Sequence, residues 1–257
     1  MFSGAVYWHG LAMVCAAAGC TWVLSLARQN VSIVDALWSL MFVMSAGVYA
    51  AGAASLGPRA WVTLVLVTVW ALRLSIYITL RNWGHGEDRR YQAIRARNQP
   101  YFAAKSLYLI FALQAALAWI ISLPLLGAIL NPSPLQIIDY LGIVLWLLGF
   151  SFEAGGDWQL ARFKSDPANQ GKVMDRGFWR LTRHPNYFGD FCVWWGFFLI
   201  AVSAGAWWSV FGPVLMSILL MRVSGVTLLE KDITDRRPRY AEYMRRTNAF
   251  FPGPRKP

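Results

Sequence analysis

Residues 61–80 read WVTLVLVTVWALRLSIYITL and contain a single charged side chain, Arg73. A helix of about 20 mainly apolar residues is long enough to cross the hydrocarbon core of a bilayer. Such a stretch fits the chain seven times, at residues 5–27, 33–54, 58–80, 107–130, 136–160, 188–206 and 208–229. We therefore predict an all-α, polytopic integral membrane protein of about seven transmembrane helices. A count of six is the alternative, because residues 188–229 could form one long bent element.

The composition agrees with a chain that faces lipid. Of the 257 residues, 57% are hydrophobic and 14% are charged, which is unlike a soluble domain. The first apolar stretch has neither the flanking charges nor the small-residue cleavage site of a signal peptide, so we expect a retained helix. The three cysteines and three histidines show no metal-ligand spacing, and we expect no metal.

Arginine and lysine fall almost entirely on one side of the predicted spans. With the amino terminus outside, the basic residues of the loops near 81–105 and 162–183 and of the tail lie inside, whereas Arg59 lies outside. Because Lys and Arg gather on the cytoplasmic side of membrane proteins, we place the basic loops and the carboxyl tail in the cytoplasm. The net charge of +11 then reflects topology, and we expect no nucleic-acid partner.

The chain shows no boundary between domains. It has no internal repeat and no long Pro/Gly/Ser-rich linker, so residues 1–257 are treated as a single transmembrane domain. The inner loops are too short for a separate Rossmann domain, and no GxGxxG motif follows a predicted strand. Any nucleotide would therefore be bound by the inner loops and the inner ends of the helices.

Several ionisable side chains lie within or at the ends of the predicted spans. Such groups are costly in hydrocarbon and usually face a cavity or a partner, so they are functional candidates. Most lie one to two turns from the inner ends of their helices and would line a cavity open to the cytoplasm. A snorkelling or ion-paired structural role is the alternative for each. They are Asp35, Arg73, Glu153, Asp157, Asp190, Arg222 and Glu230.

Residues 183–190, RHPNYFGD, lead directly into a predicted span. Pro185 tolerates a helix start, so free N–H groups, Asn186 and two cations gather at a helix amino terminus, which suits an anion. Arg183 could make two hydrogen bonds to a phosphate, and Asp190 could accept hydrogen bonds from a ribose or carboxamide. The alternative is an interfacial cap anchored by Tyr187 and its phenylalanine neighbour.

The tail carries a second polar set. Tyr240 and Tyr243 are spaced to share a helical face, with Arg246 and Thr247 one turn further on. An adenine could stack on such a face while an arginine binds phosphate. A basic patch that binds anionic membrane lipid is the alternative.

The amino-terminal half contributes a candidate acid. Asp35 lies beside Trp38 near the start of the second span, where a buried carboxyl group can donate a proton or hydrogen bond to a substrate oxygen. On the third span, Trp70 and Tyr77 share a face, and Tyr77 could act as a second donor. In the loop that follows, Glu87 is expected to pair with a nearby arginine or with ligand hydroxyls.

Residues 183–190 resemble the steroid 5α-reductase family when they are compared together with the Asp157 region, Leu229-Glu230-Lys231 and RTNAFFP at 246–252. Bacterial membrane reductases of that family are the most similar. The resemblance is clearest over residues 140–252, and SIVDALW at 32–38 and the loop at 81–91 add weaker support. It implies seven transmembrane helices, here in a bacterial inner membrane, with NADPH held on the cytosolic side. The implied reaction is hydride transfer to the carbon–carbon double bond of a Δ4-3-ketosteroid.

The resemblance also assigns roles to residues. The first half, 1–130, would form the substrate pocket, with Asp35 and Tyr77 catalytic and Trp38 and Trp70 contacting the sterol-like enone. The second half, 131–257, would bind the cofactor. The family's second-helix Gln-Glu pair is absent, so Asp35 is the nearest acidic match. The candidate cofactor-binding residues are Arg81, Glu87, Asp157, Lys164, Arg183, His184, Asn186, Tyr187, Asp190, Arg222, Glu230, Lys231, Tyr240, Tyr243, Arg246 and Thr247.

Two other functions are compatible with these residues. Membrane methyltransferases of the isoprenylcysteine carboxyl type share an Arg-His-Pro-x-Tyr-x-Gly segment and a tyrosine-rich basic tail, and they use S-adenosylmethionine. That ligand has no phosphates to occupy so many arginines. A non-enzymatic sterol- or lipid-binding membrane protein is the other possibility. We expect a monomer in each case.

Overall fold

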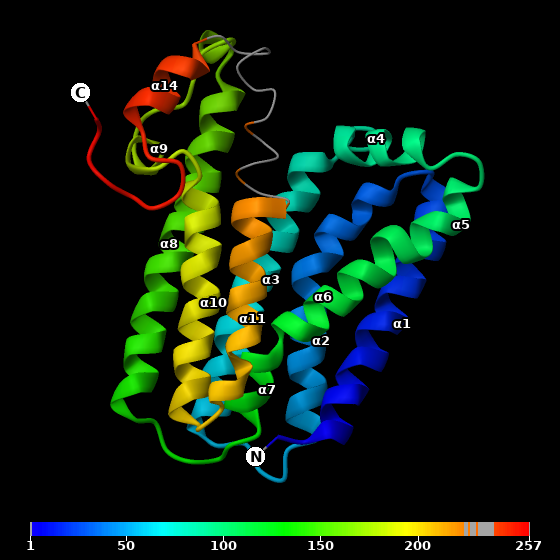
Figure 1. Cartoon of the computed structure of the whole chain (residues 1–257), viewed down its shortest axis with the longest axis vertical. Coiled ribbons are helices and arrows are strands. Elements are labelled where there is room, and N and C mark those ends of the chain that lie inside the picture. The colour runs from blue at the N-terminus through cyan, green and yellow to red at the C-terminus, as the bar shows by residue number, and fades with distance from the viewer. Residues whose placement is uncertain (1, 224–225, 227–229, 231–238, 257) are drawn as a thin grey trace. The chain divides into compact units, whose positions relative to one another are not determined.

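The computed structural model describes residues 2–223, 226, 230 and 239–256. All regular structure in these residues is helical, which confirms the predicted all-α class (Figure 1). Contacts divide the chain into two compact units. Unit 1 comprises residues 1–136 and 200–209, and unit 2 comprises residues 137–199 and 210–257.

Five helical segments within the described residues are long and apolar enough to cross a membrane, which is compatible with an integral membrane protein. The predicted count of seven is not confirmed. The two later candidates differ from the five: α10 (Pro185–Ser203) carries Asn186 and Asp190 in its first turns, and the described part of the last apolar helix covers Trp207–Val223. The five segments are Gly4–Arg28, Val31–Ala51, Pro58–Asn82, Phe102–Ile121 and Ile137–Ser165.

Unit 1 is built around α2, which packs against α1 on one side and α3 on the other. The Ser39 hydroxyl donates to the carbonyl of Ala71 at 2.8 Å, and the Trp22 indole donates to the carbonyl of Ala103 at 3.0 Å. The elements are α1 (Gly4–Arg28), η1 (Val31–Ile33), α2 (Val34–Ala51), α3 (Pro58–Asn82), α4 (Arg89–Arg97), α5 (Phe102–Ser106), the π-helix η2 (Leu107–Ala112), α6 (Leu113–Ile121) and α7 (Leu123–Ile129).

A buried arginine fixes the start of α3. The Arg59 guanidinium is fully buried and donates to the Ser133 hydroxyl at 2.6 Å, the Pro134 carbonyl at 2.9 Å and the Ser203 hydroxyl at 3.2 Å. Buried polar groups require such partners. Arg59 therefore joins three separate segments of unit 1.

Unit 2 contains two long helices, α8 (Ile137–Ser165) and α10, which lie side by side (Figure 1). A Cβ atom added at Gly149 would lie 2.5 Å from the Gly189 carbonyl oxygen, and one added at Gly196 would lie 2.8 Å from that of Gly142. Small residues allow the backbones of membrane helices to approach this closely. Glycines at both helices therefore set the α8–α10 spacing.

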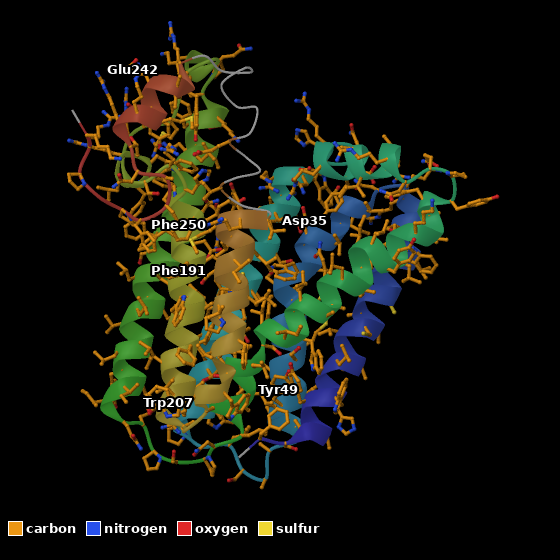
Figure 2. All side chains as sticks on the ribbon, viewed as in Figure 1. Asp35, Tyr49, Phe191, Trp207, Glu242 and Phe250 are labelled. Atoms are coloured by element: carbon orange, nitrogen blue, oxygen red, sulfur yellow. The ribbon has the colours of Figure 1, made fainter. Side chains whose placement is uncertain are left out.

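Short elements complete unit 2. They are η3 (Pro167–Asn169), α9 (Phe178–Leu181), η4 (Trp207–Val210), which crosses the boundary between the units, α11 (Phe211–Ile218), the π-helix η5 (Leu219–Val223) and α14 (Tyr240–Arg246). The carboxyl tail packs on α10, where the labelled rings of Phe191 and Phe250 (Figure 2) have centroids 5.6 Å apart. An ion pair between Arg255 and Asp175 fixes the end of the tail.

Candidate functional site

The amino end of α10 is a densely bonded polar region among the described residues of unit 2. Pro185 is the first helical residue, as the sequence predicts, and the segment before it is fixed by Thr182. The Thr182 hydroxyl donates to the Phe250 carbonyl at 2.8 Å and accepts a hydrogen bond from the His184 amide at 3.3 Å. The tail therefore determines how the chain enters α10.

Arg183 is occupied by protein groups. Its Nε and Nη2 atoms donate to the two carboxylate oxygens of Glu230 at 2.7 and 2.8 Å. Its Nη1 atom donates to the carbonyls of Thr247 at 2.6 Å and Met244 at 3.0 Å. A guanidinium has five N–H groups, and four are used here. The two-bond contact predicted for a phosphate is thus made to Glu230, because this carboxylate lies within reach of the fork.

Glu230 also pairs with His184. The His184 Nε2 and Glu230 Oε1 atoms are 2.9 Å apart, and the imidazole stacks on Tyr187 with ring planes 5° apart. Burial acts to raise the pKa of the Glu230 carboxyl, but hydrogen bonds from His184 and Arg183 and their charges outweigh it and lower the pKa to about 2. Glu230 is therefore a carboxylate at neutral pH, and Arg183, His184 and Glu230 form a structural clamp.

Three candidate cofactor-binding residues come together beside this clamp. The Asn186 side-chain amide donates to Asp157 Oδ1 at 3.2 Å, so the first turn of α10 is joined to α8. Asp190 follows one turn after Asn186 and, like Asp157, is buried. The close approach of Gly156 to Pro185, 3.1 Å from a Cβ position, makes this grouping possible.

The tail tyrosines are packed inside the protein. Tyr240 and Tyr243 are buried, their rings meet edge to face at 5.2 Å, and the Tyr243 hydroxyl donates to the Trp179 carbonyl. Burial raises the pKa of Tyr243. Arg246 instead is 53% exposed and pairs with Glu242. The two rings are thus not an open stacking surface, because both are buried.

The remaining cofactor candidates of unit 2 lie at three different places. Lys164 lines an open cavity of about 360 Å³ together with Lys172 at the end of α8. Arg222 is exposed in η5, and Thr247 is buried at the end of α14. Lys231 lies outside the described residues.

Asp35 of unit 1 lies in a network that the sequence did not predict. It is the second residue of α2, near the end of the helix opposite Tyr49 (Figure 2). Its Oδ1 atom accepts a hydrogen bond from the Tyr91 hydroxyl at 2.5 Å, and its Oδ2 atom accepts one from Arg90 at 2.8 Å. Arg90 also donates to Asp88 at 3.0 Å. Asp35 is therefore a paired hydrogen-bond acceptor, and its tyrosine partner is Tyr91.

Glu87 pairs with an arginine, as expected. It accepts hydrogen bonds from Arg95 at 2.7 and 2.8 Å and from the Val31 amide at 2.9 Å. Burial acts to raise the pKa of the Glu87 carboxyl, but these hydrogen bonds outweigh it and lower the pKa below its usual value. Glu87 thereby fixes the loop before α4 to the start of η1.

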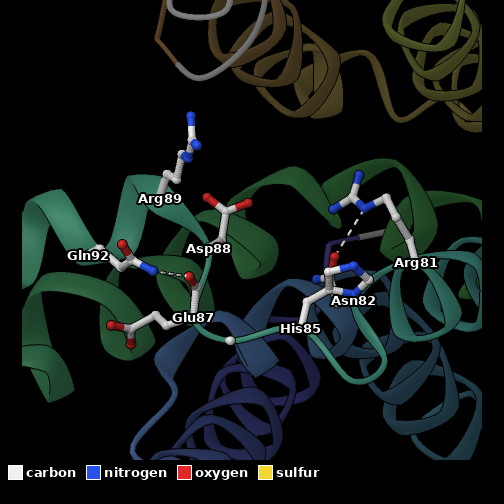
Figure 3. Close-up of a pocket in the computed structure, with 8 residues that line it drawn as sticks. Arg81, Asn82, His85, Glu87, Asp88, Arg89 and Gln92 are labelled. Carbon is white, nitrogen blue, oxygen red and sulfur yellow. Dashed lines mark hydrogen bonds between the residues drawn. The ribbon is translucent and has the colours of Figure 1, made fainter. Parts of the chain in front are cut away.

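An open cavity of about 380 Å³ lies beside this loop (Figure 3). Figure 3 shows Arg81 bonded to the Asn82 side chain and Gln92 bonded to the Glu87 carbonyl, at 3.1 and 2.6 Å. The cavity is lined by Arg81, Asn82, His85, Gly86, Glu87, Asp88, Arg89 and Gln92. Of the candidate cofactor residues, Arg81 and Glu87 lie here and not in unit 2.

The substrate candidates of unit 1 lie close to the α2–α3 interface. Trp70 is fully buried and its ring is 5.7 Å from that of Phe42. Trp38 meets the same phenylalanine edge to face at 5.3 Å. Tyr77 lies 5.9 Å from the Arg81 guanidinium. Phe42 thus joins the two tryptophans, whereas Tyr77 is placed toward the end of α3.

Tyr91, Arg90 and Gln114 are the site residues that sequence reasoning missed. Gln114 donates to the Tyr91 hydroxyl at 3.2 Å. Arg90 and Tyr91 are adjacent in a polar stretch of the sequence, which is the signal that could have found them. Their pairing with Asp35 spans more than 50 positions and leaves no periodic pattern in the sequence.

A family model described as "Protein of unknown function (DUF1295)" matches residues 21–247. The chain belongs to this family. It is 24% identical to an uncharacterized protein of Schizosaccharomyces pombe, over 90% of this chain and 75% of the yeast protein. No solved structure matches the chain.

Proposed function

We propose that this DUF1295 protein is an NADPH-dependent membrane reductase that reduces the carbon–carbon double bond of an enone, with a Δ4-3-ketosteroid as the expected substrate. The proposal includes α10 and Trp207–Val223 as the sixth and seventh crossings, with the basic loops in the cytoplasm. The observation that carries it is the grouping of Asn186, Asp157 and Asp190 at the start of α10.

These side chains suit the sugar and carboxamide parts of the cofactor. An amide that donates and accepts, flanked by two carboxylates, can bind ribose hydroxyls and a nicotinamide carboxamide. Arg183 is committed to Glu230, so phosphate binding is assigned to Lys164 and Lys172, which line one cavity. The residues present therefore fit the cofactor, although with a different phosphate ligand from the one expected.

The reaction also needs an acid at the substrate oxygen. NADPH, when bound, would supply a hydride to the β-carbon, and negative charge would then develop on the carbonyl oxygen of the enone. A positioned hydrogen-bond donor stabilises that charge in a site with little water. We assign this role to Asp35 in its protonated form, whose carboxyl group is held in place by the Tyr91 hydroxyl at 2.5 Å and by Arg90 at 2.8 Å.

The test uses the full-length protein in detergent with NADPH and a panel of enones, with products identified by mass. We expect a product two hydrogens heavier than a Δ4-3-ketosteroid. We expect Asp35→Asn to lower the rate by at least about 100-fold, because a positioned acid contributes about that much. Asn186→Ala should lower it through weaker binding of NADPH. Asn98→Ala is the matched control, since that amide donates to the Ile94 carbonyl within α4.

A thermal shift assay separates the alternative functions. Stabilisation by NADPH supports the reductase. Stabilisation by S-adenosylmethionine alone would point to a methyltransferase, and stabilisation by sterol with neither nucleotide would point to a binding protein. Full activity of either site variant would remove that residue from the mechanism.

A further inference from the structure

Two arginines of unit 1 line the open cavity of about 380 Å³ between α3 and α4. Arg81 lies in the last turn of α3, and Arg89 is the first residue of α4. Figure 3 shows them at the two ends of the loop that joins these helices. Both residues are exposed, so a ligand at the surface of the protein can reach both guanidinium groups.

The acids beside this cavity are paired with other cations. Glu87 accepts two hydrogen bonds from Arg95, at 2.7 and 2.8 Å. Asp88 accepts one from Arg90 at 3.0 Å, and Arg90 also bonds to Asp35 at 2.8 Å. Together with the two lining arginines, four guanidinium groups therefore stand against three carboxyl groups. The surroundings of the cavity carry a net positive charge, which suits an anion.

The loop geometry brings the two arginines to one cavity. Gly84 has a φ of +74°, a left-handed conformation that glycine adopts without strain. The Asp88 side chain accepts a hydrogen bond from the Arg90 amide at 2.9 Å and so caps α4. The turn and the cap together determine where Arg89 begins its helix.

Exposed apolar side chains run along α3 toward the same end of the helix. Leu72, Ile76 and Leu80 are 47%, 57% and 68% exposed, and their spacing of four residues places them along one face. Trp83, which is 76% exposed, directly follows α3. In a helix that crosses a membrane, such a face contacts acyl chains, and a tryptophan at its end lies at the level of the lipid headgroups.

We propose that the cavity between α3 and α4 binds the phosphate headgroup of an anionic phospholipid, with Arg81 and Arg89 as its ligands. The planar guanidinium group matches a phosphate because it can make two parallel hydrogen bonds. The proposed topology places this loop on the cytoplasmic side, where anionic lipids attract basic segments beside membrane helices. The acyl chains then lie along the exposed face of α3. This inference uses the proposed topology and is independent of the reductase activity.

Native mass spectrometry of the full-length protein tests this site. The delipidated protein, in detergent and 0.15 M ammonium acetate, is titrated with dioctanoyl phosphatidylglycerol, which is anionic, or dioctanoyl phosphatidylcholine, which has no net charge. We expect the anionic lipid to bind at least about fivefold more tightly. Arg81→Gln and Arg89→Gln should each weaken its binding about fivefold, the value of one basic residue near a membrane surface, and the double variant about 25-fold. Equal affinity for the two lipids, or wild-type affinity of the double variant, would overturn the proposal.

Arg97→Gln is the matched control. Arg97 is also exposed and lies at the other end of α4, about 12 Å from the start of the helix. That distance exceeds the Debye length of about 8 Å at 0.15 M ionic strength, so this variant should keep the wild-type affinity. A loss as large as that of Arg89→Gln would overturn the cavity as the site and indicate a diffuse basic surface. The unfolding midpoints of all four variants without lipid should equal that of the wild type, because these side chains are exposed.

Two competitors identify what occupies the cavity. Glycerophosphoglycerol carries the headgroup phosphate without acyl chains, so it should displace the lipid only at much higher concentration. Equal affinity of this soluble anion would overturn a lipid as the ligand. NADPH should leave the bound lipid in place. Displacement by NADPH that is lost in the Arg81→Gln and Arg89→Gln variants would assign the cavity to the cofactor and overturn the proposal.

Discussion

Replacement of Gly189 by alanine should separate α8 from α10. A Cβ atom at this position would lie 2.4 Å from the Glu153 amide nitrogen and 2.5 Å from the Gly149 carbonyl oxygen. Both atoms belong to the backbone of α8, so a change of side-chain rotamer cannot relieve the contact. The helices would have to move apart by about 1 Å to reach an ordinary contact of 3.4 Å.

That movement has a cost in stability and in binding. Overpacking of this kind typically lowers the free energy of unfolding by about 1–3 kcal/mol. The higher helix propensity of alanine offsets less than about 1 kcal/mol of this loss. The Asn186–Asp157 hydrogen bond is 3.2 Å long, and a further 1 Å would break it. We therefore expect a lower unfolding midpoint in detergent together with weaker stabilisation by NADPH.

Gly47→Ala is the matched control. Gly47 also lies within a membrane helix, α2, but a Cβ atom there would meet no atom within 4 Å. Its midpoint should stay unchanged or rise. Equal midpoints for the two variants, measured by differential scanning fluorimetry in the same detergent, would refute the claim that glycine contacts set the α8–α10 distance.

Three further changes test other contacts. The folded pKa of Glu230 is depressed to about 2 from 4.5, so its carboxylate stabilises the protein at neutral pH by up to about 3 kcal/mol. This contribution is lost as pH falls from about 4.5 toward 2, and Glu230→Gln should remove that part of the pH dependence of urea unfolding. Arg59→Lys should lower the free energy of unfolding by about 1.5–3 kcal/mol, because one ammonium cannot reach all the partners of a buried guanidinium. An unfolding midpoint equal to that of the wild type would contradict this. Tyr243→Phe should lower the free energy of unfolding by about 1 kcal/mol, because the hydrogen bond to the Trp179 carbonyl is lost. Limited proteolysis should then release the tail more readily, and cleavage at the wild-type rate would contradict a role for this bond.

The membrane helices could be predicted because their signal is local. The run at 61–80 needs no partner to be recognised, and it lies within α3. Pro185 was expected to start a helix because its own ring sets the backbone angle and removes an N–H group. The beginning of the fourth span at Phe102 rather than residue 107 was missed, because polar Lys105 interrupts the apolar run.

The pairing of charged side chains could not be predicted. Arg183 had two plausible partners, a phosphate or a carboxylate, and only the fold brings Glu230 to 2.7 Å across 47 positions. The same holds for Asp35, whose nearest aromatic neighbour in sequence is Trp38 but whose bonded partner is Tyr91. Sequence spacing orders residues along one helix, whereas these contacts depend on how different helices meet.

The length of α8 bears on how a charged molecule could reach Asp157. At about 1.5 Å per residue, the 29 residues of this helix extend over about 43 Å, whereas the hydrocarbon core of a bilayer is about 30 Å thick. If the hydrocarbon begins at Ile137, the last two to three turns stand in the headgroup layer and the water beyond it. Asp157 would then lie at the depth where lipid gives way to headgroups. A nucleotide could contact Asp157 from the aqueous phase without entering the hydrocarbon core, while an apolar substrate could arrive through the lipid.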